Sequence, residues 1–302
     1  MYIKLSAGDY TAKIDLKGAN CISLKNSRYN ARLLNEPPAG GDSDNPYIYG
    51  IPILFPVNRI ESGRFEFDGK EYVFPVNDGN NCHIHGNIHK SVFKATNITE
   101  SSVICTHKAI LGGINEFEIK AEYKLDKKGL TQTIEITNLS DSNMPCLLGF
   151  HTAFNTLFTE NSRAEDITIF AQISEEFERS TKTYLPTGKT VEFDAVSQSL
   201  ANGTLKLLEN ISRHYRAKDE GISIIYDKAN NLSLVYENDI KYGFRLIFSN
   251  DIKKYICIEP QNCLVNCPNS PFDRTYAGFD YISPKKSKRY VSKIYIEEGN
   301  RL

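Results

Sequence analysis

The sequence contains no tryptophan, no Cys-x-x-Cys pair and no apolar run near the roughly 20 residues that a membrane-spanning helix needs. Neither sign of charge dominates, because 37 acidic side chains stand against 36 basic ones, for a formal net charge of -1. This balance argues against a nucleic-acid-binding surface and against an anionic membrane partner. The first residues lack the apolar segment of a secretory signal, so we expect a cytoplasmic protein.

The seven cysteines are odd in number and scattered, which predicts reduced thiols rather than a disulfide framework. The chain is instead rich in tyrosine (17) and phenylalanine (16), and its hydrophobic fraction is 40%. Its 302 residues suffice for one large all-β domain or for two ordinary domains. Composition leaves the oligomeric state open between a monomer and a homodimer.

Alternation of apolar and polar residues with a period of two is the dominant pattern. It is clearest from Phe117 to Leu125, which precedes a turn and a return strand over residues 131–137. Further strands are expected at residues 10–16, 21–24, 64–67, 70–74, 222–226, 232–236, 244–248 and 291–297. Strands without intervening helices or linkers predict an all-β fold, a large antiparallel sandwich in a single domain over residues 1–302.

Other segments depart from the strand pattern. The best helix candidate is residues 197–210, which is weak because Gly203 lies in its middle. Residues 35–45 and 177–189 are rich in turn-forming residues and are expected to be long loops.

One predicted strand ends in an acid, since residues 255–261 read Tyr-Ile-Cys-Ile-Glu-Pro-Gln. Side-chain alternation places Ile256 and Ile258 on one face and Glu259 on the other. Pro260 cannot donate a ladder hydrogen bond, so the strand is expected to end there or to turn out of the sheet. Apolar neighbours raise the pKa of a carboxyl group into a range useful for proton transfer, although this stretch alone also fits a solvated strand-end glutamate.

Three other stretches carry candidate chemistry. Arg59 stands between apolar residues and close to two prolines, which fits either a buried ion pair or ligand binding. His83 and His85 would share a strand face, with His89 nearby, and this spacing predicts a cupin-like metal site as an alternative function. His151 lies in an apolar strand, where a histidine is either a hydrogen-bonded core residue or a catalyst.

Taken together, these stretches resemble the aldose 1-epimerase (galactose mutarotase) family. The resemblance rests on Asn-Arg-Ile at residues 58–60, His-Gly at 85–86, Gly-Phe-His-Thr-Ala-Phe at 149–154 and Glu-Pro-Gln at 259–261, in the family's order. It implies the β-supersandwich of that family, with no metal and no organic cofactor. The implied activity is interconversion of the α and β anomers of a hexose such as galactose or glucose, so the expected partner is a small-molecule monosaccharide.

The resemblance also assigns roles to residues. Glu259 matches the general base and His151 the general acid, and the two are expected on opposite sides of the sugar ring. Arg59 and His85 match residues that hold the sugar hydroxyls and the ring oxygen. Two further substrate-binding residues are expected, with Asn58 shaping the site and Phe154, or another aromatic residue, stacking on the sugar face.

The sequence departs from the family pattern where an Asp-x-x-Phe/Tyr segment is expected, because residues 212–215 read Ser-Arg-His-Tyr. Two alternatives to this activity stay open, and the departure supports the first of them. One is a sugar-binding or regulatory module that lacks turnover. The other is an epimerase for hexose 6-phosphates, for which Arg213, Arg216 and Lys90 are candidate phosphate ligands.

Overall fold

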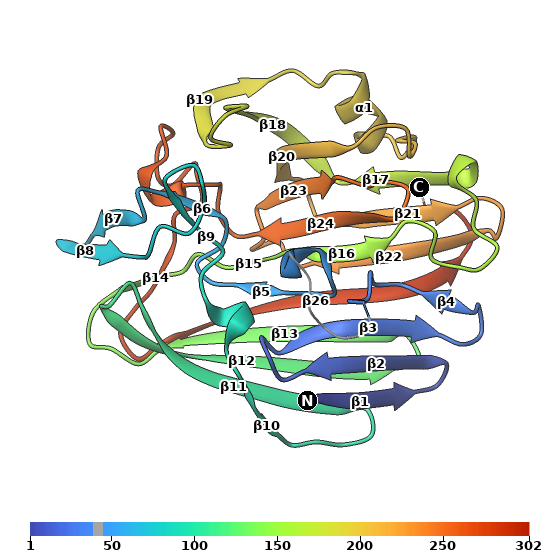
Figure 1. Cartoon of the computed structure of the whole chain (residues 1–302), viewed down its shortest axis with the longest axis horizontal. Helices are drawn as coiled ribbons and strands as arrows, with labels where there is room; N and C mark the ends of the chain where they lie inside the picture. The colour runs from blue at the N-terminus through green and yellow to red at the C-terminus, as the bar shows by residue number, and fades with distance from the viewer. Residues whose placement is uncertain (39–44, 302) are drawn as a thin grey trace.

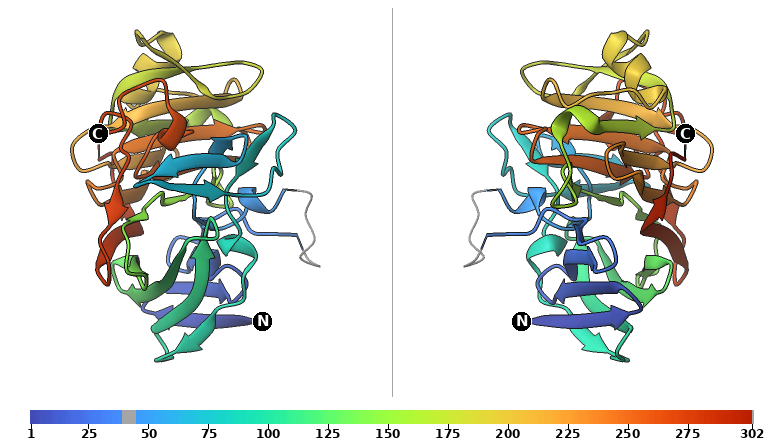
Figure 2. Two further views of the ribbon diagram at one scale, coloured as in Figure 1. Left: turned by 90° about the vertical axis from the view of Figure 1, so that its left-hand side faces the viewer. Right: turned by 90° about the vertical axis from the view of Figure 1, so that its right-hand side faces the viewer.

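The computed structural model of the chain describes residues 1–38 and 45–301. Between the strands of these residues, all pairings are antiparallel, and two eight-stranded sheets form the bulk of the molecule (Figure 1). Figure 2 shows the amino-terminal strands and the carboxy-terminal strand β26 on opposite sides of the molecule. The predicted antiparallel β-sandwich is therefore confirmed. The loop expected at residues 35–45 falls partly outside the described residues.

The first sheet, which we call the back sheet, has the strand order β10-β11-β12-β13-β26-β22-β21-β17. The predicted hairpin is its β12–β13 pair, in which the apolar positions of β12 are buried as the alternation indicates. Its strands are β10 (Lys94–Thr96), β11 (Ser102–Leu111), β12 (Asn115–Asp126), β13 (Gly129–Asn138), β17 (Ile167–Ala171), β21 (Ser223–Asp227), β22 (Leu232–Asn238) and β26 (Ser287–Glu298).

The second sheet, which we call the site sheet, has the order β19-β18-β20-β23-β24-β15-β5, and β16 also pairs with β24. Its strands are β5 (Ile53–Leu54), β15 (Gly149–Phe150), β16 (Thr152–Asn155), β18 (Ile173–Arg179), β19 (Pro186–Val191), β20 (Ile211–Ala217), β23 (Phe244–Ser249) and β24 (Tyr255–Gln261). The loop predicted at residues 177–189 is wrong, because this segment contains the end of β18 and the start of β19. β19 is a mostly exposed edge strand, so it lacks the apolar alternation that marks a strand in sequence.

One face of the site sheet packs on the back sheet. The rings of Phe154 on β16 and Tyr236 on β22 lie 5.2 Å apart, and Ile256 and Ile258 belong to the same buried core. Contrary to expectation, β24 continues through Pro260 to Gln261. The ladder beside it is interrupted between β15 and β16, opposite Glu259 and Pro260, and such a break accommodates a proline.

The remaining elements cover these sheets. A four-stranded amino-terminal sheet contains β1 (Tyr2–Ala7), β2 (Tyr10–Asp15), β3 (Asn20–Asn26) and β4 (Ala31–Arg32). Three small pairs join β6 (Arg59–Glu61) to β9 (Cys82–Ile84), β7 (Arg64–Phe67) to β8 (Lys70–Val73), and β14 (Met144–Pro145) to β25 (Tyr281–Ile282). Short 3-10 turns are η1 (Pro46–Ile48), η2 (Ile88–Lys90), η3 (Ala164–Asp166) and η4 (Cys267–Asn269).

The helix α1 (Ala195–Ala201) is shorter than the predicted segment and begins earlier. The carboxylate of Asp194 accepts hydrogen bonds from the amides of Val196 and Ser197, both at 3.0 Å, and so caps its first turn. Among the helices that the structure describes, none has the length and apolar character to cross a bilayer. All seven cysteines are buried free thiols, as predicted.

Candidate active site

The two predicted catalytic residues lie side by side on the face of the site sheet that points away from the back sheet. Thr152 pairs with Ile258 across β16 and β24, and this register brings residue 151 next to residue 259. His151 Nε2 lies 3.2 Å from Glu259 Oε1, and both side chains are almost fully buried. The expectation that the two groups stand on opposite sides of a sugar ring is wrong, because neighbouring strands hold them in direct contact.

A chain of amides supports the second oxygen of the glutamate. The side-chain amide of Gln261 donates to Glu259 Oε2 at 3.2 Å, and Asn58 Nδ2 donates to Gln261 Oε1 at 3.5 Å. The backbone carbonyl of Asn58 also accepts a hydrogen bond from the amide of His85 at 3.1 Å. Asn58 therefore positions both the amide chain and the neighbouring histidine.

His85 enters the site from a turn rather than from a strand face. Its φ of +64° ends β9, and Gly86 follows at +59°, where an added Cβ would lie 2.1 Å from the carbonyl oxygen of Phe55. Only glycine fits there. The His85 ring lies 5.8 Å from that of His151, and the Tyr47 ring lies 4.6 Å from His85.

The turn also separates the three histidines of the predicted metal site. His83 packs on Phe74 and its Nδ1–H donates to the carbonyl of Pro75 at 2.8 Å, away from His85. His89 lies against Tyr47, with ring centroids 4.9 Å apart. No group of three His, Cys, Asp or Glu side chains suited to a metal ion occurs within residues 1–38 and 45–301. The donor set does not support the cupin-like alternative.

Arg59 is largely buried and forms an ion pair, one of its two expected roles, with a partner that the sequence did not identify. Its Nε lies 2.5 Å from Asp78 Oδ2, and its guanidinium lies over the ring of Tyr184 at 4.9 Å. Burial raises the pKa of Glu259, and the positive charge of Arg59 offsets a small part of that rise, as expected of a guanidinium within electrostatic range of the candidate catalytic pair. Both interpretations of Arg59 therefore remain compatible with its position.

Sequence reasoning missed Arg179, which stands at the end of β18 in the segment expected to be a loop. Its Nη2 donates to the carbonyl of Ser212 at 2.7 Å and to Ser212 Oγ at 3.0 Å. Its charge lowers the pKa of both Glu259 and His214. His214 is fully buried, and its two ring nitrogens have no hydrogen-bond partner among the described residues. Residues 212–215, which depart from the family pattern, thus contribute Ser212, whose hydroxyl accepts a hydrogen bond from Arg179.

The candidate phosphate ligands Arg213 and Arg216 are already engaged elsewhere. Arg213 pairs with Glu176 at 3.0 Å and with Asp194 at 2.7 Å, while Arg216 pairs with Glu175 at 3.0 Å. Neither guanidinium is free to serve a phosphate beside the catalytic pair.

Phe154 does not line the site, which corrects its assignment as a stacking residue. Alternation along β16 turns it toward the core, where it is fully buried against Tyr236. Two aromatic rings do lie beside the imidazole of His151, that of Phe248 on β23 at 5.7 Å and that of Tyr47 at 6.2 Å.

Burial shifts the pKa values of the two candidate catalytic groups in opposite directions. It raises the pKa of Glu259 well above its usual value, an effect that Arg179, Gln261 and Arg59 partly offset. It lowers the pKa of His151 to about 4. Because burial disfavours the charged form of each group, the pair favours one shared proton held between a neutral imidazole and a neutral carboxylic acid.

Comparison with known proteins identifies the family of the chain. The model of the aldose 1-epimerase family matches residues 1–277. The crystal structure of a galactose mutarotase-like protein from Clostridium acetobutylicum is 31% identical, has a TM-score of 0.91, and is matched over 98% of this chain and 95% of that one. The chain belongs to the aldose 1-epimerase family.

More distant relatives share less. Galactose 1-epimerase from Lactobacillus acidophilus has the same fold at 14% identity, with a TM-score of 0.72 over 99% of this chain and 95% of that chain. Protein LacX from Lactococcus lactis is 29% identical over 90 residues, which span 28% of this chain and 30% of the length of that protein.

Proposed function

We propose that the protein is an aldose 1-epimerase that interconverts the α and β anomers of a free hexose such as galactose or glucose. The contact between His151 and Glu259 carries this proposal, together with membership of the family. The reaction needs only proton transfer, which an acid and a base in contact supply.

Their contact is compatible with anomer exchange because the anomeric oxygen and the ring oxygen are bonded to the same carbon. When the shared proton lies on His151, Glu259 is a carboxylate, and it takes the proton of the anomeric hydroxyl while the bond from C1 to the ring oxygen breaks. His151 as imidazolium protonates that ring oxygen, and C1 becomes an aldehyde. After rotation about C1–C2, His151 takes back the hydroxyl proton, the oxygen attacks the other carbonyl face, and Glu259 returns its proton to the anomeric oxygen.

The pair holds one proton in total throughout the reaction. This proton lies on the imidazole of His151 before ring opening, and one lies on the carboxyl group of Glu259 afterwards. Ring opening converts an ion pair into two neutral groups, and burial favours that direction. Arg59, His85 and Arg179 supply donors around the pair, and donors aimed at oxygens that gain charge stabilise the transition state. Tyr47 and Phe248 provide the apolar surface.

Polarimetry of freshly dissolved α-D-glucose, α-D-galactose and glucose 6-phosphate, with and without protein, tests the proposal. We expect faster decay of optical rotation for at least one neutral hexose. Acceleration of glucose 6-phosphate alone would transfer the activity to phosphorylated sugars. Sugar binding by calorimetry without any acceleration would identify a non-catalytic sugar-binding module.

A further inference from the structure

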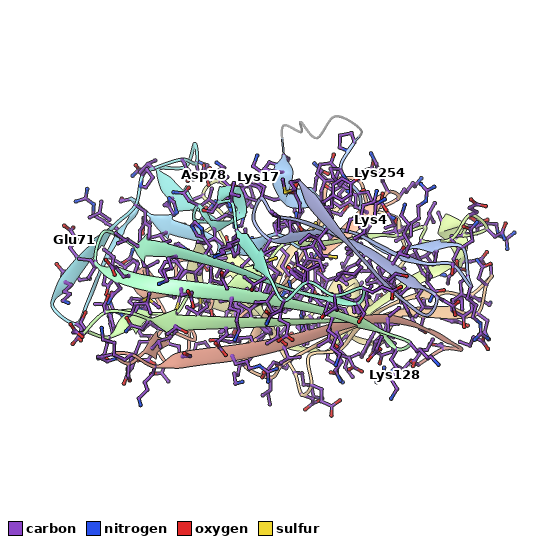
Figure 3. The ribbon with its side chains drawn as sticks, turned by 90° about the horizontal axis from the view of Figure 1, so that it is seen from below. Lys4, Lys17, Glu71, Asp78, Lys128 and Lys254 are labelled. Atoms are coloured by element: carbon purple, nitrogen blue, oxygen red, sulfur yellow. The ribbon has the colours of Figure 1, made fainter. Side chains whose placement is uncertain are left out.

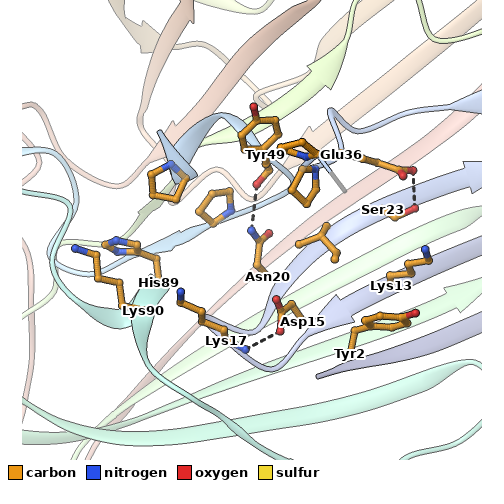
Figure 4. A pocket seen from close by; sticks show the side chains of 15 residues that line it. Tyr2, Lys13, Asp15, Lys17, Asn20, Ser23, Glu36, Tyr49, His89 and Lys90 are labelled. Carbon is orange, nitrogen blue, oxygen red and sulfur yellow. Dashed lines mark hydrogen bonds between the residues drawn. The ribbon is translucent and has the colours of Figure 1, made fainter. Parts of the chain in front are cut away.

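A pocket with a volume of about 740 Å³ lies between the amino-terminal sheet and the segment of residues 46–52 (Figure 4). Neither Glu259 nor His151 lines it. Its walls combine lysines and a histidine with Tyr49 and several prolines, a mixture of charged and apolar surface that suits a small ligand.

Two cations gather at one end of this pocket. Lys17 and Lys90 stand beside His89 in Figure 4, and the two backbone segments are joined because the amide of Gly18 donates to the carbonyl of Ser91 at 2.7 Å. The positive charges of Lys90 and Lys17 both help to lower the pKa of His89, as expected of close neighbours. Within the part of the chain that the structure describes, neither ammonium group has a carboxylate partner at ion-pair distance.

The carboxylates of the pocket are committed to other groups. Glu36 Oε1 pairs with Lys25 at 3.1 Å and accepts a hydrogen bond from Ser23 Oγ at 2.8 Å. Asp15 Oδ1 lies 3.8 Å from the amino group of Met1 and accepts a hydrogen bond from the backbone amide of Lys17 at 3.1 Å. Among the described residues, the ammonium groups of Lys17 and Lys90 therefore carry positive charge that no carboxylate neutralises at ion-pair distance.

His89 adds a polar group that lacks a protein partner. It is only 9% exposed, and neither buried ring nitrogen has a partner at good hydrogen-bond geometry among the described residues, although the backbone of His85 lies close enough to raise its pKa in part. Burial lowers its pKa to about 4, so the ring is neutral near pH 7 and offers one donor and one acceptor. A buried polar group without a partner is costly, and a ligand in the pocket would satisfy it.

We propose that this pocket binds the phosphate group of a small phosphorylated metabolite. Lys17 and Lys90 supply two point charges suited to a dianion, and the imidazole N–H of His89 donates to a phosphate oxygen. Tyr49 and the neighbouring prolines pack against the organic part of the molecule.

The pocket is separate from the catalytic pair but shares supporting residues with it. Pro52 lines the pocket, and its carbonyl accepts the backbone amide of His151 at 3.3 Å. His89 contacts Tyr47, which in turn contacts His85. Lys17 of the pocket and Asp78 of the catalytic site lie on the same side of the molecule, opposite Lys128 (Figure 3).

Calorimetric titration with inorganic phosphate and with glucose 6-phosphate, at constant ionic strength, tests the proposal. We expect saturable binding of at least one of them, weakened at least tenfold in the double variant Lys17→Gln/Lys90→Gln. His89→Phe, which keeps a ring against Tyr47 but removes both nitrogens, should also weaken binding. Tighter binding of the ester would identify a phosphorylated metabolite as the ligand, and tighter binding of inorganic phosphate the free anion.

Two controls separate this pocket from the catalytic site and from general charge. Lys13→Gln changes a lysine that lies over the ring of Tyr2 at 5.4 Å, at the other end of the pocket, and should leave phosphate affinity unchanged. Glu259→Gln should also leave it unchanged, even if that variant abolishes anomer exchange. Absence of saturable binding, or equal affinity in the double-lysine variant and the unmodified protein, would overturn the proposal.

Discussion

The imidazole of His151 contacts the carboxylate of Glu259, with Nε2 3.2 Å from Oε1, because β16 and β24 are neighbours in the site sheet. Two buried groups at this distance titrate as one unit. The pair is active in our account when it holds a single proton, and it is inactive when it holds two or none.

This dependence predicts a bell-shaped profile of kcat/KM against pH. Burial lowers the pKa of His151 to about 4, so activity should fall near that pH as the pair gains its second proton. Burial raises the pKa of Glu259, so the alkaline fall, where the last proton leaves, should lie well above the usual range of a carboxyl group. Polarimetric rates from pH 3 to pH 10 would check this, and a profile without an acidic limb would contradict it.

Arg179 should tune the alkaline limb. Its charge lowers the pKa of Glu259, so Arg179→Gln should raise that pKa and move the alkaline fall to higher pH. The measurement is the same pH profile on the variant. Arg213→Gln is a suitable control, because Arg213 pairs with Glu176 and Asp194, and its profile should coincide with that of the unmodified protein.

The ion pair between Arg59 and Asp78 should affect substrate binding more than turnover. Asp78→Asn removes the charge that holds the guanidinium, and a charge-assisted hydrogen bond contributes about 1.5–3 kcal/mol, so KM should rise on the order of tenfold. The control is Glu71→Gln, which breaks an exposed pair with Arg64 at 3.6 Å. Equal KM values for the two variants would show that Arg59 does not depend on Asp78.

Phe154 and Phe248 should respond differently to the same substitution. Phe154→Leu shrinks a buried core side chain and should lower the free energy of unfolding by roughly 1–3 kcal/mol, with KM unchanged. Phe248→Leu changes the ring beside His151 and should raise KM instead. Urea unfolding and polarimetric kinetics distinguish these effects, and a raised KM in the Phe154 variant would restore its role in binding the sugar.

Sequence patterns predicted the parts of the fold where one face of a strand is wet. The hairpin of β12 and β13 is the clearest case, because charged residues alternate with buried ones along it. The edge hairpin of β18 and β19 was missed, and Arg179 with it, since an edge strand exposed on both sides carries no such alternation.

The sequence motifs predicted which residues form the centre of the candidate site, but they did not predict how these residues are arranged. The order of the motifs indicated that Glu259 and His151 belong to one site, but only the register of β16 against β24 shows that they are in contact. The same register turns Phe154 into the core. The ion pair of Arg59 with Asp78 depends on a turn that no local sequence pattern specifies. The positive φ that turns His85 away from the strand face of His83 is likewise not specified by a local pattern.

The most direct test of the shared-proton pair is optical rotation of the preferred sugar with Glu259→Gln, paired with calorimetric measurement of sugar affinity. The glutamine keeps the shape of the side chain but cannot accept the anomeric proton. We predict affinity within a few-fold of the unmodified protein and a rate of anomer exchange reduced roughly 10²–10⁴-fold. An unchanged rate would contradict the assignment of Glu259 as the base.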